Sequence, residues 1–499
     1  MMEAALHSMV GLIFDPLSLL VILLASLCGV FFGIVPGLGG KLAIALFIPV
    51  VIGMEPRLGL LFLVAMHAVV HTGGSVPSIL LGIPGTTPNV VTILDGYPLT
   101  RRGQAGRALG ASLLASGIGG VVGAVFLLTM LPVLKPVMLA LGPAEFFLLA
   151  VMGITFISTV SGASLRKGVI VGCLGLALSC VGLSPQTGEA RFVFGQLFLW
   201  DGIDFITVVL AMFVVPEMLA LGISGNAMTE RTTGTTAYGY RDILSGMTDV
   251  LRHRWLVLRT SLIGAFIGLI PGLGGDVASW ICYGHAAQSS DDPQRFGQGA
   301  IEGVIAPETA NNSKEGGALL PTLMFGVPGS SGMAVLLGAF LVLGVQPGPQ
   351  ILMSQQDLLL ELFSTLVLAN LIGVAVLLTI SRYLARIAYI PVGLIIPLVL
   401  VLALLGSTIS ALNWQHLLIF LVMGILAYGL KRYKWPRPPF VIGLALGPIA
   451  ENSLHQSLAI WGVDFFLRPV SLVLIGLIVA NLLVYSWRKS NKEKNATKG

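Results

Sequence analysis

Two kinds of Pro-Gly element, each present twice, interrupt the apolar parts of this sequence. A Pro-Gly-Leu-Gly-Gly stretch begins at Pro36 and again at Pro271, and a Pro-Gly pair followed by hydroxyl residues begins at Pro84 and again at Pro328. Proline lacks a backbone donor and glycine permits left-handed conformations, so a regular helix cannot continue through these elements. Inside a bilayer, such a break is tolerated where protein shields it or where it lines a watery cavity.

Helix breaks of this kind leave free backbone groups that can bind ions. Free N–H groups at the start of a half-helix bind carboxylates, and free carbonyl groups at its end coordinate cations. A tight packing kink is the alternative explanation, and the hydroxyls after the second kind of break either cap the next helix or reach a ligand. Four breaks at paired positions favour a binding site. The candidate substrate- and cation-binding residues at the breaks are Pro36, Gly37, Gly39, Gly40, Pro84, Gly85, Thr86, Thr87, Pro271, Gly272, Gly274, Gly275, Pro328, Gly329, Ser330 and Ser331.

A dense polar segment from 306 to 317 lies between the two breaks of the second half. An asparagine amide can donate to a carboxylate and accept from a cation at once, although ordinary loop polarity is the alternative. Lys314 is expected to pair with Glu315 or Glu308 rather than with a substrate carboxylate. The candidate binding residues in this segment are Glu308, Asn311, Asn312 and Ser313.

Two aspartates complete the candidate set. Asp95 follows the first pair of breaks and is placed either to cap the next helix or to bind a cation. Asp276 directly follows the second Pro-Gly-Leu-Gly-Gly, at the position where the first half has Lys41. The predicted site is therefore pseudo-symmetric, with different charges in its two halves.

Known catalytic and metal-binding motifs are missing from the sequence. His67 and His71 stand four residues apart, but the HExxH zinc motif needs a glutamate directly after its first histidine, where this chain has Ala68. The four cysteines form no CxxC pair, and there is no Walker P-loop. Residues 273 to 276 read Leu-Gly-Gly-Asp and so miss the GxGD of intramembrane aspartyl proteases. We therefore predict no enzymatic activity, no resident metal and no cofactor.

The chain contains an internal repeat. The Pro-Gly-Leu-Gly-Gly elements are offset by 271 − 36 = 235 residues, and the segments around the second breaks, aligned on Pro77 and Pro321, by 321 − 77 = 244 residues. No Lys or Arg precedes the first leading helix, whereas five arginines lie between 231 and 259, around the start of the second. By the positive-inside rule, we predict that the first leading helix begins outside the membrane and the second begins inside. Many secondary transporters have inverted-topology repeats of this kind.

Composition indicates a membrane protein. Hydrophobic residues make up 55% and charged residues 10% of the 499 residues, and the mean hydropathy is +0.92; soluble domains carry about a quarter charged residues. A bilayer core of about 30 Å needs about 20 helical residues, and the apolar runs predict an all-α polytopic fold with about 10–12 transmembrane helices, broken or re-entrant ones included. We divide the chain into a first membrane repeat (1–222), a cytoplasmic polar linker (223–254), a second membrane repeat (255–487) and a basic cytoplasmic tail (488–499).

This topology can be tested by cysteine labelling. The basic residues of the linker and tail predict that both are cytoplasmic and that the N-terminus is periplasmic, so the tail needs no nucleic-acid partner. Single cysteines at Ser8, Thr235 and Ser490 in a cysteine-free background are expected to react with an impermeant maleimide in intact cells only at Ser8. Labelling at Thr235 but not at Ser8 would reverse the assignment.

The repeated elements belong to a longer set of motifs. From about residue 29 to 350 the chain contains, in this order, GIVPGLGG, LLGIPGT, LDGYPLTRRGQAGRALGAS, LSPQTGEARFVFG, LWDGIDF, GLIPGLGG, GVIAPETANN and GGALLPTLMFGVPGSSGMAVLLGAF. In this order and spacing they resemble the large membrane subunit of tripartite tricarboxylate transporters. Family members often have Asn where this chain has Gly82, and small residues where it has Lys314 and Glu315. These departures bear on the substrate and on the ion stoichiometry.

The resemblance implies a protein of the bacterial cytoplasmic (inner) membrane that works with a small membrane subunit and a periplasmic solute-binding protein. It also implies uptake of di- and tricarboxylates or related organic acids together with a cation. The alternatives are a secondary transporter that works without a binding protein and a channel. Channels usually show charge rings or carbonyl filters in an oligomer, which fits duplicated broken helices less well.

A co-transported cation follows from the energetics of anion uptake. Each unit charge moved across 100 mV costs about 2.3 kcal/mol, so accumulating an anion against an inside-negative potential needs Na⁺ or H⁺. The helix breaks offer neutral carbonyl, hydroxyl and amide oxygens, which suit Na⁺. A proton needs a titrating group, and the acidic residues near the motifs are Asp95, Asp276, Glu302 and Glu308. The sequence therefore favours Na⁺ over H⁺.

Overall fold

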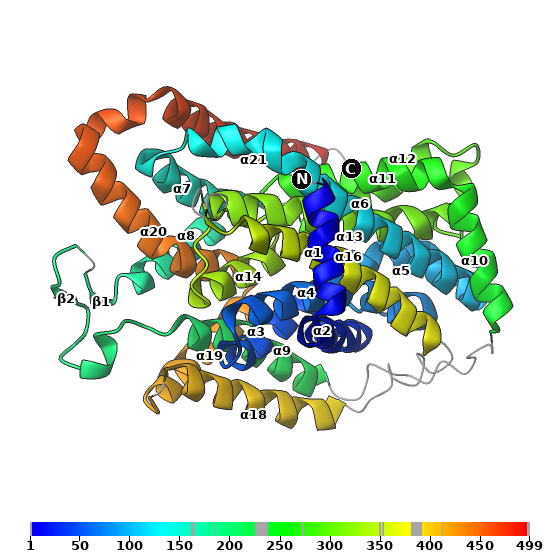
Figure 1. The fold of residues 1–499 in the computed structure, drawn as a ribbon, viewed down its shortest axis with the longest axis horizontal. Coiled ribbons are helices and arrows are strands. Elements are labelled where there is room, and N and C mark those ends of the chain that lie inside the picture. Colours follow the sequence, from blue (N-terminus) through cyan, green and yellow to red (C-terminus); the bar gives the residue numbers. More distant parts are fainter. Residues whose placement is uncertain are drawn as a thin grey trace.

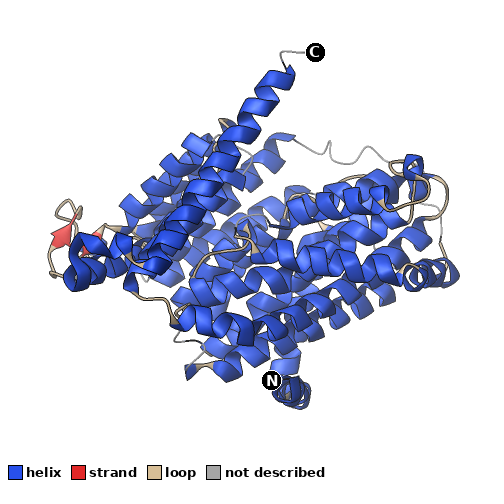
Figure 2. Ribbon diagram, turned by 90° about the horizontal axis from the view of Figure 1, so that it is seen from above, coloured by secondary structure: helices blue, strands red, loops and turns tan. Residues whose placement is uncertain are grey.

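The computed structural model describes residues 2–160, 165–184, 186–224, 238–271, 274–348, 351, 354–380, 392–411 and 413–496. These ranges contain nineteen α-helices and a single pair of two-residue antiparallel strands (Figure 1). Figure 2 shows helices along almost all of the chain, with the strands confined to one edge. The all-α prediction is confirmed.

The first half contains nine helices, a strand pair and two short 3₁₀ turns. They are α1 (Met2–Phe14), α2 (Pro16–Ile34), α3 (Gly39–Ile52), α4 (Pro56–Leu81), η1 (Thr87–Asn89), α5 (Val90–Arg101), α6 (Ala105–Leu139), α7 (Pro143–Val160), α8 (Leu165–Ser179), β1 (Gly182–Leu183), β2 (Ala190–Arg191), η2 (Leu197–Leu199) and α9 (Phe205–Ser224).

The rest of the described chain is also helical. Its elements are α10 (Tyr240–Arg252), α11 (Arg254–Leu269), α12 (Gly274–Gln288), η4 (Pro293–Arg295), α13 (Glu302–Phe325), α14 (Ser331–Val342), α16 (Gln356–Thr379), α18 (Val392–Ala411), α19 (His416–Arg432), α20 (Pro438–Trp461), η6 (Gly462–Leu467) and α21 (Pro469–Ala496).

All four Pro-Gly elements separate helices, as the sequence predicts. The first kind lies between α2 and α3 and between α11 and α12, and the second kind follows α4 and α13. Gly82 and Gly326 end α4 and α13 in the left-handed conformation, with φ of 69° and 65°, which glycine adopts without strain. Ser330 then caps α14, because its hydroxyl oxygen accepts from the N–H of Met333 at 3.2 Å.

The same close helix contact occurs in both halves. A Cβ added to Gly33 in α2 would lie 2.1 Å from the carbonyl oxygen of Val70 in α4, and one added to Gly268 in α11 would lie 2.2 Å from that of Lys314 in α13. These pairs are related by the two sequence offsets, since 33 + 235 = 268 and 70 + 244 = 314. The repeat seen in the sequence is therefore a repeat of packing.

The corresponding helices α4 and α13 meet in opposite directions. The amide of Asn312 donates to the Thr72 hydroxyl at 2.7 Å, and His67 Nε2 lies 3.4 Å from Glu315 Oε2. Residue 312 of α13 contacts residue 72 of α4, and the later residue 315 contacts the earlier residue 67. The two helices therefore run antiparallel where they touch. An inverted-topology pair requires this relation.

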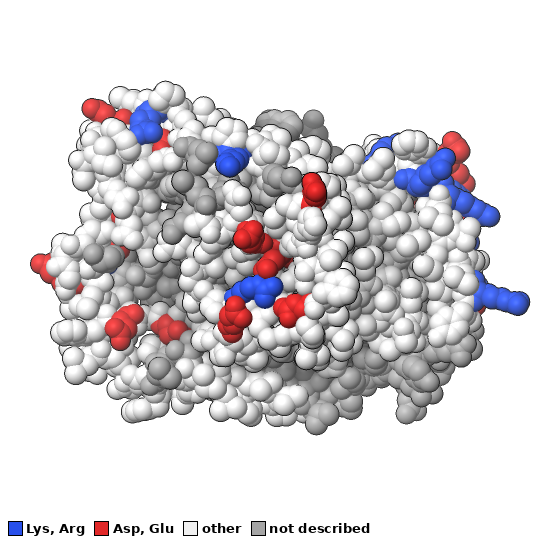
Figure 3. Space-filling view, viewed as in Figure 1, with Lys and Arg blue, Asp and Glu red and all other residues white. Residues whose placement is uncertain are grey.

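The helix lengths are those of a membrane protein with broken spans. By length and composition, five described helices can cross a membrane: α2, α4, α6, α9 and α16. A sixth candidate span is the α20–η6–α21 pair, which is bent by 65°. Five shorter apolar helices of the described chain add to these, and two of them, α3 and α14, begin at a Pro-Gly break and are below full spanning length. Figure 3 shows a largely uncharged face with charged side chains in a few separate groups.

The predicted linker and tail are only partly described. Residues 225–237 and 497–499 lie outside the described residues. The second part of the predicted linker is helix α10, which packs on α6 of the first repeat. Arg107 Nε donates to Asp249 Oδ2 at 2.5 Å across this contact. This part of the predicted linker is therefore ordered against the first repeat.

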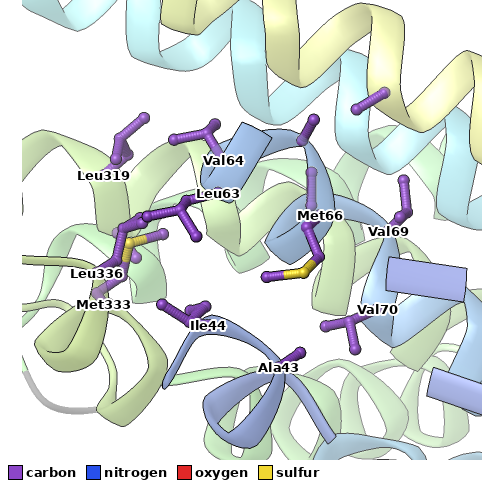
Figure 4. Packing of buried hydrophobic residues seen from close by; sticks show 14 of the residues in the cluster. Ala43, Ile44, Leu63, Val64, Met66, Val69, Val70, Leu319, Met333 and Leu336 are labelled. Atoms are coloured by element: carbon purple, nitrogen blue, oxygen red, sulfur yellow. The ribbon is translucent and has the colours of Figure 1, made fainter. Parts of the chain in front are cut away.

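A shared hydrophobic core holds the elements around the breaks. Figure 4 shows Ile44 of α3, Met66 of α4 and Leu319 of α13 close to Met333 and Leu336 of α14. All five side chains are at most 2% exposed. Helices of both repeats therefore contribute to one core beside the breaks.

Candidate functional site

The helix breaks of both repeats line one cavity of about 650 Å³. Gly274 lies against Ser330 there, since a Cβ added to Gly274 would be 3.5 Å from the Ser330 Cβ. Eleven of the residues predicted from the sequence line this cavity, and they are Gly37, Gly39, Gly40, Pro84, Gly85, Thr86, Thr87, Gly274, Gly275, Ser330 and Ser331.

The other predicted residues lie elsewhere. Pro36, Pro271, Pro328 and Gly329 are at the breaks but do not line the cavity. Gly272 and the side chain of Asp276 lie outside the described residues. Five further candidates are buried away from the cavity lining, and these are Asp95, Glu308, Asn311, Asn312 and Ser313.

Asp95 holds the segment that leads into α13. One carboxylate oxygen accepts from the N–H groups of Gly299 and Ala300 at 2.7 and 2.8 Å, and the other accepts from the Tyr283 hydroxyl at 2.9 Å. These donors belong to the second repeat, so Asp95 does not cap the next helix, α6. In the structure it connects the two halves.

Glu308 also connects the two halves. It lies on α13, and its carboxylate accepts from Thr92 at 2.5 Å and from Asn89 and Ser116 at 3.0 Å each. All three donors belong to the first repeat. A fully buried carboxylate needs such donors to offset its lost hydration.

The two adjacent asparagines of α13 have different environments. The Asn312 amide nitrogen donates to Thr72 at 2.7 Å and to Asn370 at 2.8 Å. Asn311 is 1% exposed, and neither polar atom of its side chain has a hydrogen-bond partner. It lies directly behind Gly275, where an added Cβ would be 2.8 Å from Asn311 Oδ1. A buried polar atom left unpaired costs about 1–3 kcal/mol, so the Asn311 amide is a ready ligand for an ion or substrate.

Positive charge exceeds negative charge around the cavity. Among the described side chains, Lys41, Lys314, Lys431 and Arg437 line it, together with one carboxylate, Glu217. Lys431 and Arg437 both pair with Glu217, at 2.6 and 2.7 Å.

Lys314 pairs with Glu315, as expected from the sequence. Among the described side chains, four cations line the cavity, against the two carboxylates Glu217 and Glu315. This balance suits an anionic ligand with more than one carboxylate.

Sequence reasoning passed over His67 and His71, which both line the cavity. His71 Nδ1 lies 3.1 Å from the Thr86 hydroxyl, and its Nε2 lies 3.0 Å from Glu315 Oε1. The repeat offset was the available signal, because 67 + 244 = 311 places His67 at the position that corresponds to Asn311. His67, His71 and Glu315 have ligand atoms within 4.8 Å of one another, which metal coordination also allows.

Glu302, one of the acidic residues considered as a proton carrier, does not line the cavity. It begins α13 and pairs with Arg295 at 2.9 Å and with His253 at 3.6 Å. These partners hold it at the end of the helix, away from the four breaks.

An all-α membrane protein with paired helix breaks around a cationic cavity has the architecture of a secondary transporter. The family model described as the Tripartite tricarboxylate transporter TctA family matches residues 19–442. The chain belongs to this family and is the large, multi-pass membrane subunit of a tricarboxylate transporter that has further subunits. The resemblance read from its motifs is confirmed.

The chain is also similar to two proteins from Agrobacterium vitis. The chain is 30% identical over 484 residues to a protein described as "Uncharacterized 52.8 kDa protein in TAR-I ttuC' 3'region", covering 96% of this chain and 95% of the relative. It is 32% identical over 217 residues to an "Uncharacterized protein in TAR-II ttuC' 3'region", covering 43% of this chain and 90% of the relative. No solved structure matches the chain.

Proposed function

We propose that this chain is the transport-conducting subunit of a binding-protein-dependent secondary transporter. It takes up di- and tricarboxylates or related organic acids by cation symport. The observation that carries the proposal is the set of four described cationic side chains that line a cavity built from four helix breaks, namely Lys41, Lys314, Lys431 and Arg437.

The substrate class follows from charge and from the family. Free N–H groups at the starts of α3 and α12, together with Lys41, give a carboxylate several donors at once. The volume of about 650 Å³ accommodates a small organic acid with its hydration water.

Cation symport is supported by the neutral oxygens beside this cavity. The unpaired amide of Asn311 lies behind Gly275, and Thr87 and Ser331 add hydroxyls at the lining. Neutral oxygens of this kind suit a hard monovalent cation such as Na⁺. We therefore assign Na⁺ to the Asn311 side of the site.

The family description names a tripartite system. We assign the other two parts to a small membrane subunit and a periplasmic solute-binding protein, which places the complex in the bacterial cytoplasmic membrane. In this arrangement, the binding protein captures the organic acid and delivers it to the cavity.

Reconstitution tests the proposal. Proteoliposomes containing the chain and both partners are expected to accumulate labelled citrate or succinate when an inward Na⁺ gradient is imposed at equal pH. Accumulation without the binding protein would favour a transporter that works alone, and rapid equilibration without accumulation would favour a channel. If neither a Na⁺ nor a pH gradient drives uptake of any acid in the panel, the symport proposal is wrong.

A further inference from the structure

Two corresponding positions of the repeats touch each other inside the protein. His71 of α4 corresponds to Glu315 of α13, since 71 + 244 = 315, and His71 Nε2 lies 3.0 Å from Glu315 Oε1. In an inverted repeat, a residue that touches its own counterpart lies on the pseudo-twofold axis. This histidine–carboxylate pair therefore lies where the two repeats meet, beside the cavity.

A chain of hydrogen bonds determines which nitrogen of His71 carries a proton. The Asn89 amide nitrogen donates to Glu308 Oε1 at 3.0 Å, so the Asn89 amide oxygen faces Thr86 and accepts its hydroxyl proton. The Thr86 oxygen then has only acceptor capacity left for His71 Nδ1, which lies 3.1 Å away. His71 Nδ1 is therefore the protonated nitrogen of the neutral ring.

This tautomer leaves no proton between His71 Nε2 and Glu315. In neutral His71, the Nε2 lone pair would face a carboxylate oxygen at 3.0 Å, and two buried acceptors in contact repel each other. Adding a proton at Nε2 turns the contact into a charge-assisted hydrogen bond. His67 offers a second basic nitrogen to the same carboxylate, with Nε2 3.4 Å from Glu315 Oε2.

A proton fits this position better than a metal ion does. Lys314 Nζ already contacts the Glu315 oxygen that faces His71. A divalent ion would add two charges next to a buried ammonium, whereas a proton adds one. The charged groups in contact within this cluster are Glu315 and Lys314 of α13. The same cavity is also lined by Lys41 of α3, Glu217 of α9, Lys431 of α19 and Arg437 before α20. Thr86, just before η1, and Gly332 of α14 are the neutral neighbours.

We propose that the cluster of His67, His71 and Glu315 binds a proton that is co-transported with the carboxylate substrate, in addition to Na⁺ at Asn311. The inference rests on the proposed function. A substrate carboxylate in the cavity stabilises an imidazolium beside it, and the imidazolium stabilises the bound anion to the same extent. The loaded protein therefore holds a proton that the empty protein releases, and no covalent step is involved.

A pH gradient at equal Na⁺ and clamped membrane potential isolates this component. In proteoliposomes with both partners, about one pH unit, acid outside, is expected to raise substrate accumulation severalfold, with a limit of about tenfold for one proton. A trapped pH dye is expected to report internal acidification when substrate is added. His71→Gln is expected to lose both responses while it keeps Na⁺-driven uptake and substrate exchange at a reduced rate. His455→Gln, an exposed histidine on α20, is the matched control and is expected to keep both.

The double variant Lys314→Gln/Glu315→Gln removes the carboxylate without leaving a buried unpaired charge, and it is expected to behave like His71→Gln even if the single variant inserts poorly. The inference is overturned if either variant, at normal membrane abundance, still responds to the pH gradient. It is also overturned if wild-type uptake follows Na⁺ alone, or if a chelator stops uptake and purified protein contains stoichiometric metal. If wild-type protein neither accumulates nor exchanges any carboxylate, the proposed function itself fails.

Discussion

Asn311→Ala is expected to reach the membrane at normal abundance and to lose Na⁺-driven uptake. Truncating its side chain breaks no hydrogen bond within the protein, because neither polar atom of the amide has a partner. A hydrogen bond from this amide to a charged ligand is worth about 1.5–3 kcal/mol, so uptake should fall by roughly 10- to 150-fold. Initial uptake rates across a Na⁺ titration, normalised to membrane abundance, measure the effect.

The neighbouring Asn312→Ala is the matched control with the opposite expectation. Its amide nitrogen donates to Thr72 and Asn370, so truncation leaves two buried acceptors without that donor. Thermal stability and membrane abundance should fall, and the remaining uptake should follow the amount of folded protein. Near-normal uptake by Asn311→Ala would show that Asn311 is not part of the site. Equal losses of stability in both variants would show that Asn311 and Asn312 have the same structural role.

The helix breaks were predictable because their cause is local. Proline removes a backbone donor and glycine reaches left-handed conformations wherever they occur in a chain, so Gly82 and Gly326 end their helices for reasons visible in the sequence. The internal repeat then relates each break in the first half to one in the second half. Because the cavity is lined largely by these breaks, most of the break residues chosen from the sequence line it.

The polar segment of α13 illustrates what local reasoning leaves open. Gly316 and Gly317 lower helix propensity and are compatible with a loop, yet the segment is a buried helix. The glycines allow neighbouring helices to approach, since a Cβ on Gly316 would lie 2.0 Å from the carbonyl oxygen of Gly123 and one on Gly317 would lie 2.0 Å from that of Ala265. Close backbone packing in the bilayer outweighs propensity here.

The roles of Asp95 and Glu308 depend on partners about two hundred residues away. Asp95 accepts from Gly299, 204 positions later, and Glu308 accepts from Asn89, 219 positions earlier. Neither composition nor periodicity contains this pairing, because it arises only when the repeats pack against each other. The same holds for His71 and Glu315, although the repeat offset does relate them.

Lys41→Gln is expected to raise the KM for a carboxylate substrate by roughly 10- to 150-fold, since a hydrogen bond to a charged group contributes about 1.5–3 kcal/mol. Lys41 lines the cavity in the first turn of α3, directly after Gly40, and its loss removes one of the four described cationic side chains that line the cavity. Lys41→Arg keeps the charge and should recover part of the affinity. It should not recover all of it, because a planar guanidinium replaces a compact ammonium.

The matched control is Lys135→Gln, which removes an exposed lysine on α6 that does not line the cavity. Initial rates over a range of substrate concentrations, measured with saturating binding protein, separate KM from the maximal rate. Because Lys41 attracts the anionic substrate, its loss should weaken the binding of tricarboxylates more than that of dicarboxylates as long as the remaining cations are unchanged. An unchanged KM, or an equal effect of Lys135→Gln, would show that Lys41 does not bind the substrate.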